Sequence, residues 1–379
     1  MNRFPVSQKT PLYAAHQRQG AKIAEFAGWE LPLWYPAGQS AEHHATRKAC
    51  GLFDICHMGE FRIRGAGSLS FLSSLLTNDV GRMQDGRAMY HLMLNPEGGV
   101  IDDCILYRFG AEDWMLVVNA GNIQTDFDWL TRHAPSGVRL EDISGRIAKI
   151  DLQGPGAPRL ISRFIAPERL AGLGFFRFIP EADVGGMEVL VSRTGYTGEV
   201  GFELYTRTDC AEELWNLLLD TGADLGILPC GLGARDSLRI EAGLPLHGHE
   251  LRPDLTAIGH PWEFVFAWDR EFIGKAAVRD KMESGTGPFV YAFRMQGRRK
   301  AMPGWEVRIG RRPAGRVLSG VIAPSLGNIP IGFLETDTRL EPGAVLSFRQ
   351  EGRPDALAGE ISPIPFVPQT CRKKMDLFL

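Results

Sequence analysis

The 379-residue sequence predicts an α+β fold, and three observations along the chain support this class. Residues typical of helix starts and ends bracket several short amphipathic segments. Strand–turn–strand patterns occur at residues 89–107 and 187–205. After Gly287, short β-like runs separated by Gly and Pro turns predict a small antiparallel barrel as a separate C-terminal domain. A chain of this length exceeds one ordinary core, so two or three domains are expected.

Helices are predicted where capping residues flank such segments. Thr10 is expected to cap the first helix, with Pro11 in its first turn and Gly20 at its end. The spacing of Asp209 and Glu212 is that of a capping box and predicts a helix over 209–221. The remaining predicted helices cover residues 40–50, 68–76 and 232–242.

Strands are predicted where apolar residues alternate or cluster between turn residues. The aromatic and proline-rich segment 26–36 is instead interpreted as a packed loop. Outside the barrel, strands are expected at 60–64, 89–94, 100–107, 114–120, 187–193 and 200–205. The barrel strands are expected at 289–295, 305–309, 315–321, 331–333, 345–348 and 357–361.

Composition and charge make some classes of protein less probable candidates. The formal net charge is −3 and both signs are interspersed, apart from short basic clusters at 298–300 and 372–374, which disfavours a nucleic-acid partner. No run approaches the ~20 apolar residues of a membrane span, and residues 1–7 lack the apolar core of a secretory signal. The six cysteines have no CxxC spacing, which is typical of reduced thiols. A cytoplasmic protein without a membrane partner is therefore expected.

Two adjacent carboxylates lie inside a predicted strand at 100–107. Because side chains alternate along a strand, Asp102 and Asp103 must face opposite sides of the sheet. Both faces are otherwise mostly apolar, so at least one carboxylate is expected to be partly buried. An ionised buried carboxylate is costly unless it is paired or functional, and the pattern alone leaves a salt bridge and a functional site equally open.

Other charged residues also allow a structural or a functional interpretation. Glu203 lies in a predicted strand near glycines, where it could accept hydrogen bonds from a flat ring, although an ordinary solvent-facing glutamate is the commoner case. Arg235 and Arg239 share a helix face, and Asp236 can pair with Arg239. Arg235 could hold a substrate carboxylate or form a structural ion pair.

Metal and thiol chemistry have weaker support. His247 and His249 could place two ligands on one face of an extended segment, but no third ligand has suitable spacing. Cys56 precedes His57 without an orienting acid in view, which gives little support for a thiol nucleophile. No glycine cluster fits a phosphate or dinucleotide loop.

A series of short motifs, each weak alone, resembles the T-protein of the glycine cleavage system when taken in order. They are TPLY (10–13), FAGW (26–29), AEHH (41–44), GLFD (51–54), HMG (57–59), TND (77–79), MLN (93–95), GGVIDD (98–103), LVVN (116–119), GYTGE (195–199), GLGARDSLR (231–239), EAG (241–243) and FIGK (272–275). The resemblance covers residues 10 to about 275 strongly and the C-terminal barrel more loosely.

The resemblance implies a three-domain cloverleaf around a central folate-binding hole, with a C-terminal antiparallel β-barrel. The expected first domain comprises residues 1–53 and 140–245, the second comprises 54–139 and 246–286, and the third comprises 287–379. The implied reaction moves the methylene of the aminomethyl-dihydrolipoyl H-protein to tetrahydrofolate and releases ammonia. A lipoylated H-protein and tetrahydrofolate are the implied partners, and neither metal nor nicotinamide is required.

The resemblance also assigns roles to individual residues. Asp102 matches the family's key acid, and Arg235 matches an arginine near the active centre. Glu203 matches the carboxylate that binds the pterin edge. Residues matching the lining of the folate pocket are Tyr90, Asn119 and Tyr196. Such a site would act by positioning its substrates and by a fixed counter-charge, without covalent catalysis.

Two departures from the family pattern concern the one-carbon donor. Cys56 stands where the family usually has serine, and residues 257–264 differ from the usual sequence near the pocket. A folate-dependent demethylase of the same superfamily, acting on a methylated small molecule, is therefore an alternative. A second alternative is a folate-binding iron–sulfur assembly factor, but its cysteine signature does not occur in this sequence.

Overall fold

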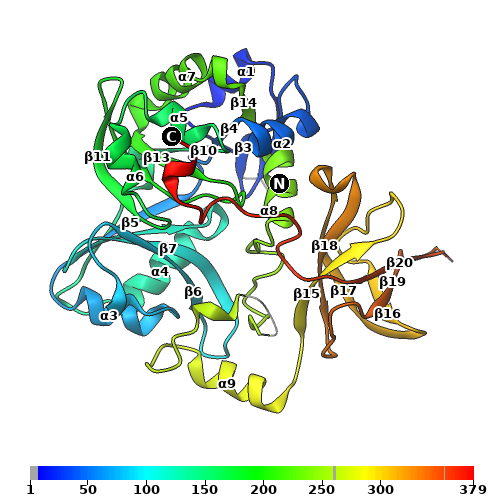
Figure 1. The fold of residues 1–379 in the computed structure, drawn as a ribbon. Helices are drawn as coiled ribbons and strands as arrows, with labels where there is room; N and C mark the ends of the chain where they lie inside the picture. Colours follow the sequence, from blue (N-terminus) through cyan, green and yellow to red (C-terminus); the bar gives the residue numbers. More distant parts are fainter. Residues whose placement is uncertain (1–6, 259–261, 354) are drawn as a thin grey trace, which may run out of the picture.

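The computed structural model describes residues 7–258, 262–353 and 355–379 and shows three lobes around a common centre (Figure 1). Each lobe has a sheet of its own, and one of the three is a closed barrel. Helices accompany mainly antiparallel sheets in the first two lobes. The predicted α+β class and the three-lobed arrangement with a barrel are confirmed.

The first lobe is built on a six-stranded sheet of order β11-β12-β13-β10-β4-β14. All neighbours are antiparallel except β4 and β14, which are parallel. Its strands are β4 (Cys50–Asp54), β10 (Ile147–Gln153), β11 (Phe178–Val184), β12 (Met187–Ser192), β13 (Gly201–Arg207) and β14 (Ile227–Cys230). Leu160 and Trp215, from helices, pack on its apolar face.

Six helices belong to this part of the chain, together with a small sheet of order β1-β3-β2. The helices are α1 (Tyr13–Arg18), α2 (Gln39–Lys48), α5 (Ala157–Ile161), α6 (Pro167–Ala171), α7 (Ala211–Thr221) and α8 (Leu232–Glu241). The small sheet consists of β1 (Gln8–Lys9), β2 (Lys22–Phe26) and β3 (Trp29–Trp34). In Figure 1, α8 lies toward the centre, between the first lobe and the barrel.

The second lobe is an antiparallel sheet of order β6-β7-β8-β5-β9 with helices packed against it. Its strands are β5 (Gly59–Arg64), β6 (Arg87–Leu94), β7 (Val100–Gly110), β8 (Asp113–Val118) and β9 (Arg139–Asp142). Its helices are α3 (Ser68–Leu75) and α4 (Ile123–His133), and α9 (Lys275–Ser284) leads from this region into the barrel (Figure 1).

The third lobe is the predicted barrel, closed in the order β15-β18-β17-β16-β19-β20. Its strands are β15 (Phe289–Met295), β16 (Glu306–Ile309), β17 (Arg312–Ala323), β18 (Ile329–Thr336), β19 (Val345–Arg349) and β20 (Ala356–Ile361). After β20 the chain returns across the centre to the first lobe, where it ends (Figure 1). No helix among the described residues is long and apolar enough to cross a membrane.

The expected domain boundaries remain a prediction. The first sheet takes its strands from residues 50–54 and 147–230, and the second takes its strands from residues 59–142. The boundary expected between residues 139 and 140 falls inside β9, which pairs with β5 of the second sheet.

Three local predictions are wrong. The segment 26–36 is largely strand β3, which pairs with β2, and a register shift beside Pro32 accommodates the missing amide donor. Asp209 and Glu212 do not form a capping box: residues 208–210 form a 3₁₀ turn, α7 begins at Ala211, and the Asp209 carboxylate accepts from Arg207 Nε. Thr10 does not cap α1, because its Oγ1 donates to Asp54 Oδ2 at 2.6 Å.

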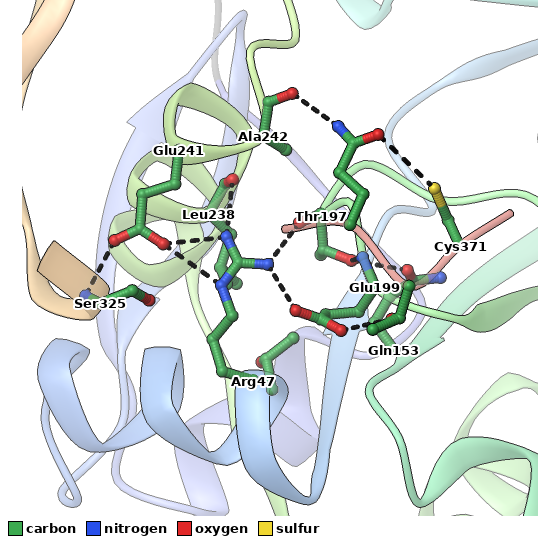
Figure 2. A network of polar contacts seen from close by, with 12 residues as sticks. Arg47, Gln153, Thr197, Glu199, Leu238, Glu241, Ala242, Ser325 and Cys371 are labelled. Carbon is green, nitrogen blue, oxygen red and sulfur yellow. Dashed lines mark hydrogen bonds and ion pairs between the residues drawn. The ribbon is translucent and has the colours of Figure 1, made fainter. Parts of the chain in front are cut away.

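The side chain of Arg47 on α2 joins three parts of the first lobe (Figure 2). Its Nη1 donates to Glu199 Oε1 at 2.9 Å and to the Thr197 carbonyl at 2.6 Å. Its Nη2 donates to Glu241 Oε2 at 2.9 Å, at the end of α8. One guanidinium therefore ties α2 to α8 and to the loop between β12 and β13.

The two carboxylates that bind Arg47 also contact the barrel and the C-terminal segment. Glu241 Oε1 accepts the backbone N–H of Ser325 in the barrel at 2.9 Å (Figure 2). Glu199 Oε2 accepts from Thr370 Oγ1 in the C-terminal segment. The Arg47 side chain is 9% exposed and that of Glu241 is fully buried, so these charges depend on one another for solvation.

Replacement of Arg47 by methionine is expected to lower the melting temperature markedly. The change leaves Glu199 and Glu241 buried without their shared cation, and breaking a buried pair in this way costs about 3–5 kcal/mol. Thermal unfolding followed by circular dichroism measures the loss. Arg18→Met is the matched control, because the Arg18–Glu212 pair is largely exposed and should contribute about 1 kcal/mol or less. Equal losses in both variants would contradict the role of Arg47.

Candidate functional site

A cavity of ≈ 1270 Å³ lies at the centre of the molecule, with walls from all three lobes. Residues of β6 and β7 form one wall, residues of β10, β13 and α8 form another, and the barrel contributes Ser319 and Gly320. A mostly apolar cavity between domains that carries a few polar groups is the usual place for a ligand site. Five of the six predicted site residues line it: Tyr90, Asn119, Tyr196, Glu203 and Arg235.

The second-lobe wall presents the carboxyl of Asp103 to the cavity. Tyr90 Oη donates to Asp103 Oδ2 at 3.0 Å, and Asn119 Nδ2 donates to Asp103 Oδ1 at 2.8 Å. Burial and repulsion by neighbouring Asp102 raise the pKa of Asp103 to about 7. This carboxyl can therefore exchange a proton near neutral pH while its position is fixed by two donors.

Asp102, the predicted catalytic acid, does not line this cavity. It is fully buried, and its carboxylate accepts from the Asn119 backbone N–H at 2.9 Å and from Asn122 Nδ2 at 2.8 Å. Burial and the nearby Asp102 charge raise the pKa of Asp126 to about 11, so Asp126 keeps its proton at neutral pH. Alternation along the strand places Asp102 and Asp103 on opposite faces of the sheet, as predicted. It does not determine which of these faces lines the cavity.

Glu203 lies on the first-lobe wall and is 4% exposed, so the solvent-facing alternative is wrong. Its Oε2 accepts from Thr194 Oγ1 at 2.9 Å and from Tyr205 Oη at 3.0 Å. Its Oε1 accepts no hydrogen bond from any residue in the described part of the chain. The carboxylate is thus held by one oxygen, and the other is available to a ligand.

Arg235 reaches the same wall from α8 and forms an ion pair, which was one of the two open alternatives, with a partner that the sequence did not indicate. Its Nη1 donates to Asp151 Oδ2 on β10 at 3.0 Å, and its guanidinium lies 4.8 Å from the centre of the Tyr196 ring. Burial raises the pKa of Asp151 to about 7, although Arg235 opposes that shift. The predicted pair of Asp236 and Arg239 is confirmed at 2.8 Å.

Strand β10 was absent from the sequence prediction, although it carries two charged residues of the cavity region. The run Ile147–Gln153 alternates buried apolar residues with Lys149, Asp151 and Gln153. That alternation is a signal for a strand with one polar face. The alternation does not indicate that the polar face borders a cavity, because segments distant in sequence form that cavity.

The structure gives no support to a metal or thiol site among the residues it describes. No group of three or more histidine, cysteine, aspartate or glutamate side chains there could hold a metal ion. His247 contacts Asn122, whereas His249 Nδ1 lies 3.2 Å from the Leu318 carbonyl. Burial and the Asp54 charge raise the pKa of the Cys56 thiol well above its usual value, which disfavours the thiolate. The segment 257–264, where the sequence differs from the family pattern, includes residues 259–261, which lie outside the described residues.

Comparison with known proteins identifies the family. The model described as the GCVT N-terminal domain matches residues 12–270. An aminomethyltransferase of Anoxybacillus flavithermus is 41% identical over 342 residues, 88% of this chain and 93% of that protein. One of Bacillus subtilis is 38% identical over 362 residues, 95% of this chain and 99% of that protein.

A solved structure shows the same arrangement of the chain. The crystal structure of the glycine cleavage system aminomethyltransferase T from Bartonella henselae has a TM-score of 0.87 and 32% identity. The match covers 96% of this chain and 99% of that one. The chain therefore belongs to the aminomethyltransferase family of glycine cleavage T-proteins.

Proposed function

We propose that this protein is a tetrahydrofolate-dependent aminomethyltransferase that takes a methylene from the aminomethyl-dihydrolipoyl H-protein and releases ammonia. The observation that carries the proposal is the central cavity with Asp103 on one wall and the open oxygen of Glu203 on another. Family membership supports the same reaction, and it favours this donor over the methylated small molecules of a demethylase. A cytoplasmic location is part of the proposal.

Glu203 is proposed to bind the pterin edge of tetrahydrofolate. A pterin presents an exocyclic amine beside a ring N–H, and a carboxylate can accept a hydrogen bond from each of them. Thr194 and Tyr205 fix Glu203 Oε2, so the side chain is oriented before a ligand arrives. Tyr196, which lies under the Arg235 guanidinium, is proposed to line the pocket for the flat ring.

Asp103, rather than Asp102, is proposed as the carboxylate that meets the reacting atoms. Transfer of the methylene develops positive charge on the carbon, which a fixed carboxylate stabilises without reorganisation. Tyr90 and Asn119 hold Asp103 in place. Asp102 is proposed as a positioning residue, because it orients Asn119 through the backbone N–H and the side-chain amide.

The proposed activity predicts release of ammonia and 5,10-methylenetetrahydrofolate when the protein meets aminomethylated H-protein and tetrahydrofolate. Ammonia is quantified enzymatically and the folate product by chromatography, with reactions lacking tetrahydrofolate as the control. Tetrahydrofolate binding without either product would contradict the proposed donor and would direct the search to methylated small molecules.

Asp103→Asn is expected to bind tetrahydrofolate normally and to lose about 100- to 1000-fold in turnover. The amide keeps the shape of the side chain but removes the charge that opposes the developing cation. Steady-state rates and a separate binding titration distinguish the two effects. Unchanged turnover in this variant would exclude Asp103 as the catalytic carboxylate.

The pH dependence of the wild-type reaction is expected to follow ionisation of Asp103. The rate should rise as pH passes through about 7, because the charged form is the active one. Asp102→Asn removes a neighbouring negative charge, which lowers the pKa of Asp103 and moves the rise to lower pH. Profiles of kcat/KM between pH 5 and 9 measure both. An identical midpoint in the two proteins would contradict the coupling of these residues.

A further inference from the structure

Lys149 is a buried cation at the cavity wall with an unused hydrogen-bonding capacity. It lies on β10, is 1% exposed and lines the central cavity. Its Nζ makes no hydrogen bond with any side chain or carbonyl of the described residues, and the nearest carboxylate oxygen paired with it, Glu60 Oε1, is 4.0 Å away. The ammonium lies 5.2 Å from the centre of the Tyr205 ring. Three donor hydrogens are therefore available.

Glu60 is too far from the Lys149 ammonium to accept a hydrogen bond from it. Its carboxylate is buried, Oε1 has no hydrogen-bond partner among the described residues, and burial raises its pKa to about 8, an effect that Lys149 opposes. A contact at 4.0 Å is beyond hydrogen-bonding distance. A buried ammonium needs close acceptors to offset its desolvation, so the site gains stability from a ligand that supplies one.

The pairing of β10 with β13 places Lys149 beside Glu203. Lys149 is opposite Tyr205, and Asp151 is opposite Glu203, so the four side chains lie on one face of the sheet. Lys149 and Glu203 are diagonal neighbours in this register, a spacing that long side chains span. The same face carries both groups toward the cavity.

The other charged group on this face is already paired. Asp151 accepts from Gln153 Nε2 at 2.7 Å through Oδ1 and from Arg235 Nη1 at 3.0 Å through Oδ2. Glu203 Oε2 is likewise occupied by Thr194 and Tyr205. One acceptor, Glu203 Oε1, and one donor, Lys149 Nζ, remain open on the same face of the sheet, as diagonal neighbours. A neighbouring acceptor and donor match a ligand edge with an N–H next to a C=O.

We propose that Lys149 is a specificity-determining residue that donates a hydrogen bond to the ring carbonyl oxygen of the pterin, while Glu203 Oε1 accepts from the adjacent ring N–H. This inference rests on the proposed function, since it assigns a contact to the same bound folate. Together, Lys149 and Glu203 favour a pterin ring that carries an oxo group next to the ring N–H. A 2,4-diaminopteridine, which has an amine at the position of the oxo group, presents a donor to the Lys149 ammonium and is disfavoured.

The test compares two probes, tetrahydrofolate and a 2,4-diaminopteridine antifolate, by titration calorimetry on the full chain. Lys149→Met is expected to weaken tetrahydrofolate binding about 10- to 100-fold, because a hydrogen bond from a charged donor is lost. Binding of the diamino probe should stay the same or tighten. Lys48→Met, on the exposed side of α2, is the matched control and should change neither affinity.

The outcomes separate this inference from the proposed function. If the wild-type chain fails to bind tetrahydrofolate, the proposed function fails. If the wild type binds and Lys149→Met binds both probes with unchanged affinity, or weakens both equally, the role of Lys149 is refuted. Should Lys149→Met fail to fold, Lys149→Gln provides the test, because it keeps a neutral donor and should lose part of the discrimination between the probes. Full discrimination in Lys149→Gln would also overturn the assignment to the ammonium.

Discussion

The guanidinium of Arg47 lies near the junction of the first lobe, the barrel and the C-terminal segment. It links α2 with the end of α8 and with the loop between β12 and β13 (Figure 2). Its carboxylate partners also accept hydrogen bonds from Ser325 and Thr370. The cavity walls come from different lobes, so their relative positions depend on such contacts. Breaking such a buried set is costly because it leaves a charge without its partner, so Arg47, Glu199 and Glu241 stabilise the side of the junction that they occupy.

Several buried carboxylates lie at or behind the cavity walls, and each has a different environment. Asp102 is surrounded by amide donors, Asp126 keeps its proton, Asp103 has a pKa of about 7, and Asp151 is paired with Arg235. Mutual repulsion is limited because only some of these groups are charged at neutral pH. Asp103 and Asp151 both have a pKa of about 7, and of these two Asp103 lines the cavity, where it can exchange a proton with a substrate.

Much of the fold was accessible from the sequence. Turn residues and alternation predicted the hairpin β6–β7 and the six barrel strands, because these are local patterns with a short repeat. Strand β3 was missed because its proline and aromatic residues resemble a loop, and its pairing with β2 includes a bulge in β3 itself. The capping box at Asp209 failed because Arg207, two residues earlier, competes for the same carboxylate.

The sequence by itself determined the class of fold, the family and the set of residue types around the site, since motifs and periodicity are local properties of the chain. Only the tertiary structure decided which of Asp102 and Asp103 faces the cavity, and that Lys149 lies beside Glu203. The physical reason is that alternation fixes the relative orientation of neighbouring side chains but leaves their absolute direction to packing. That direction is set when the sheets of two lobes meet, as at Tyr107 and Tyr205, whose hydroxyls are 2.9 Å apart.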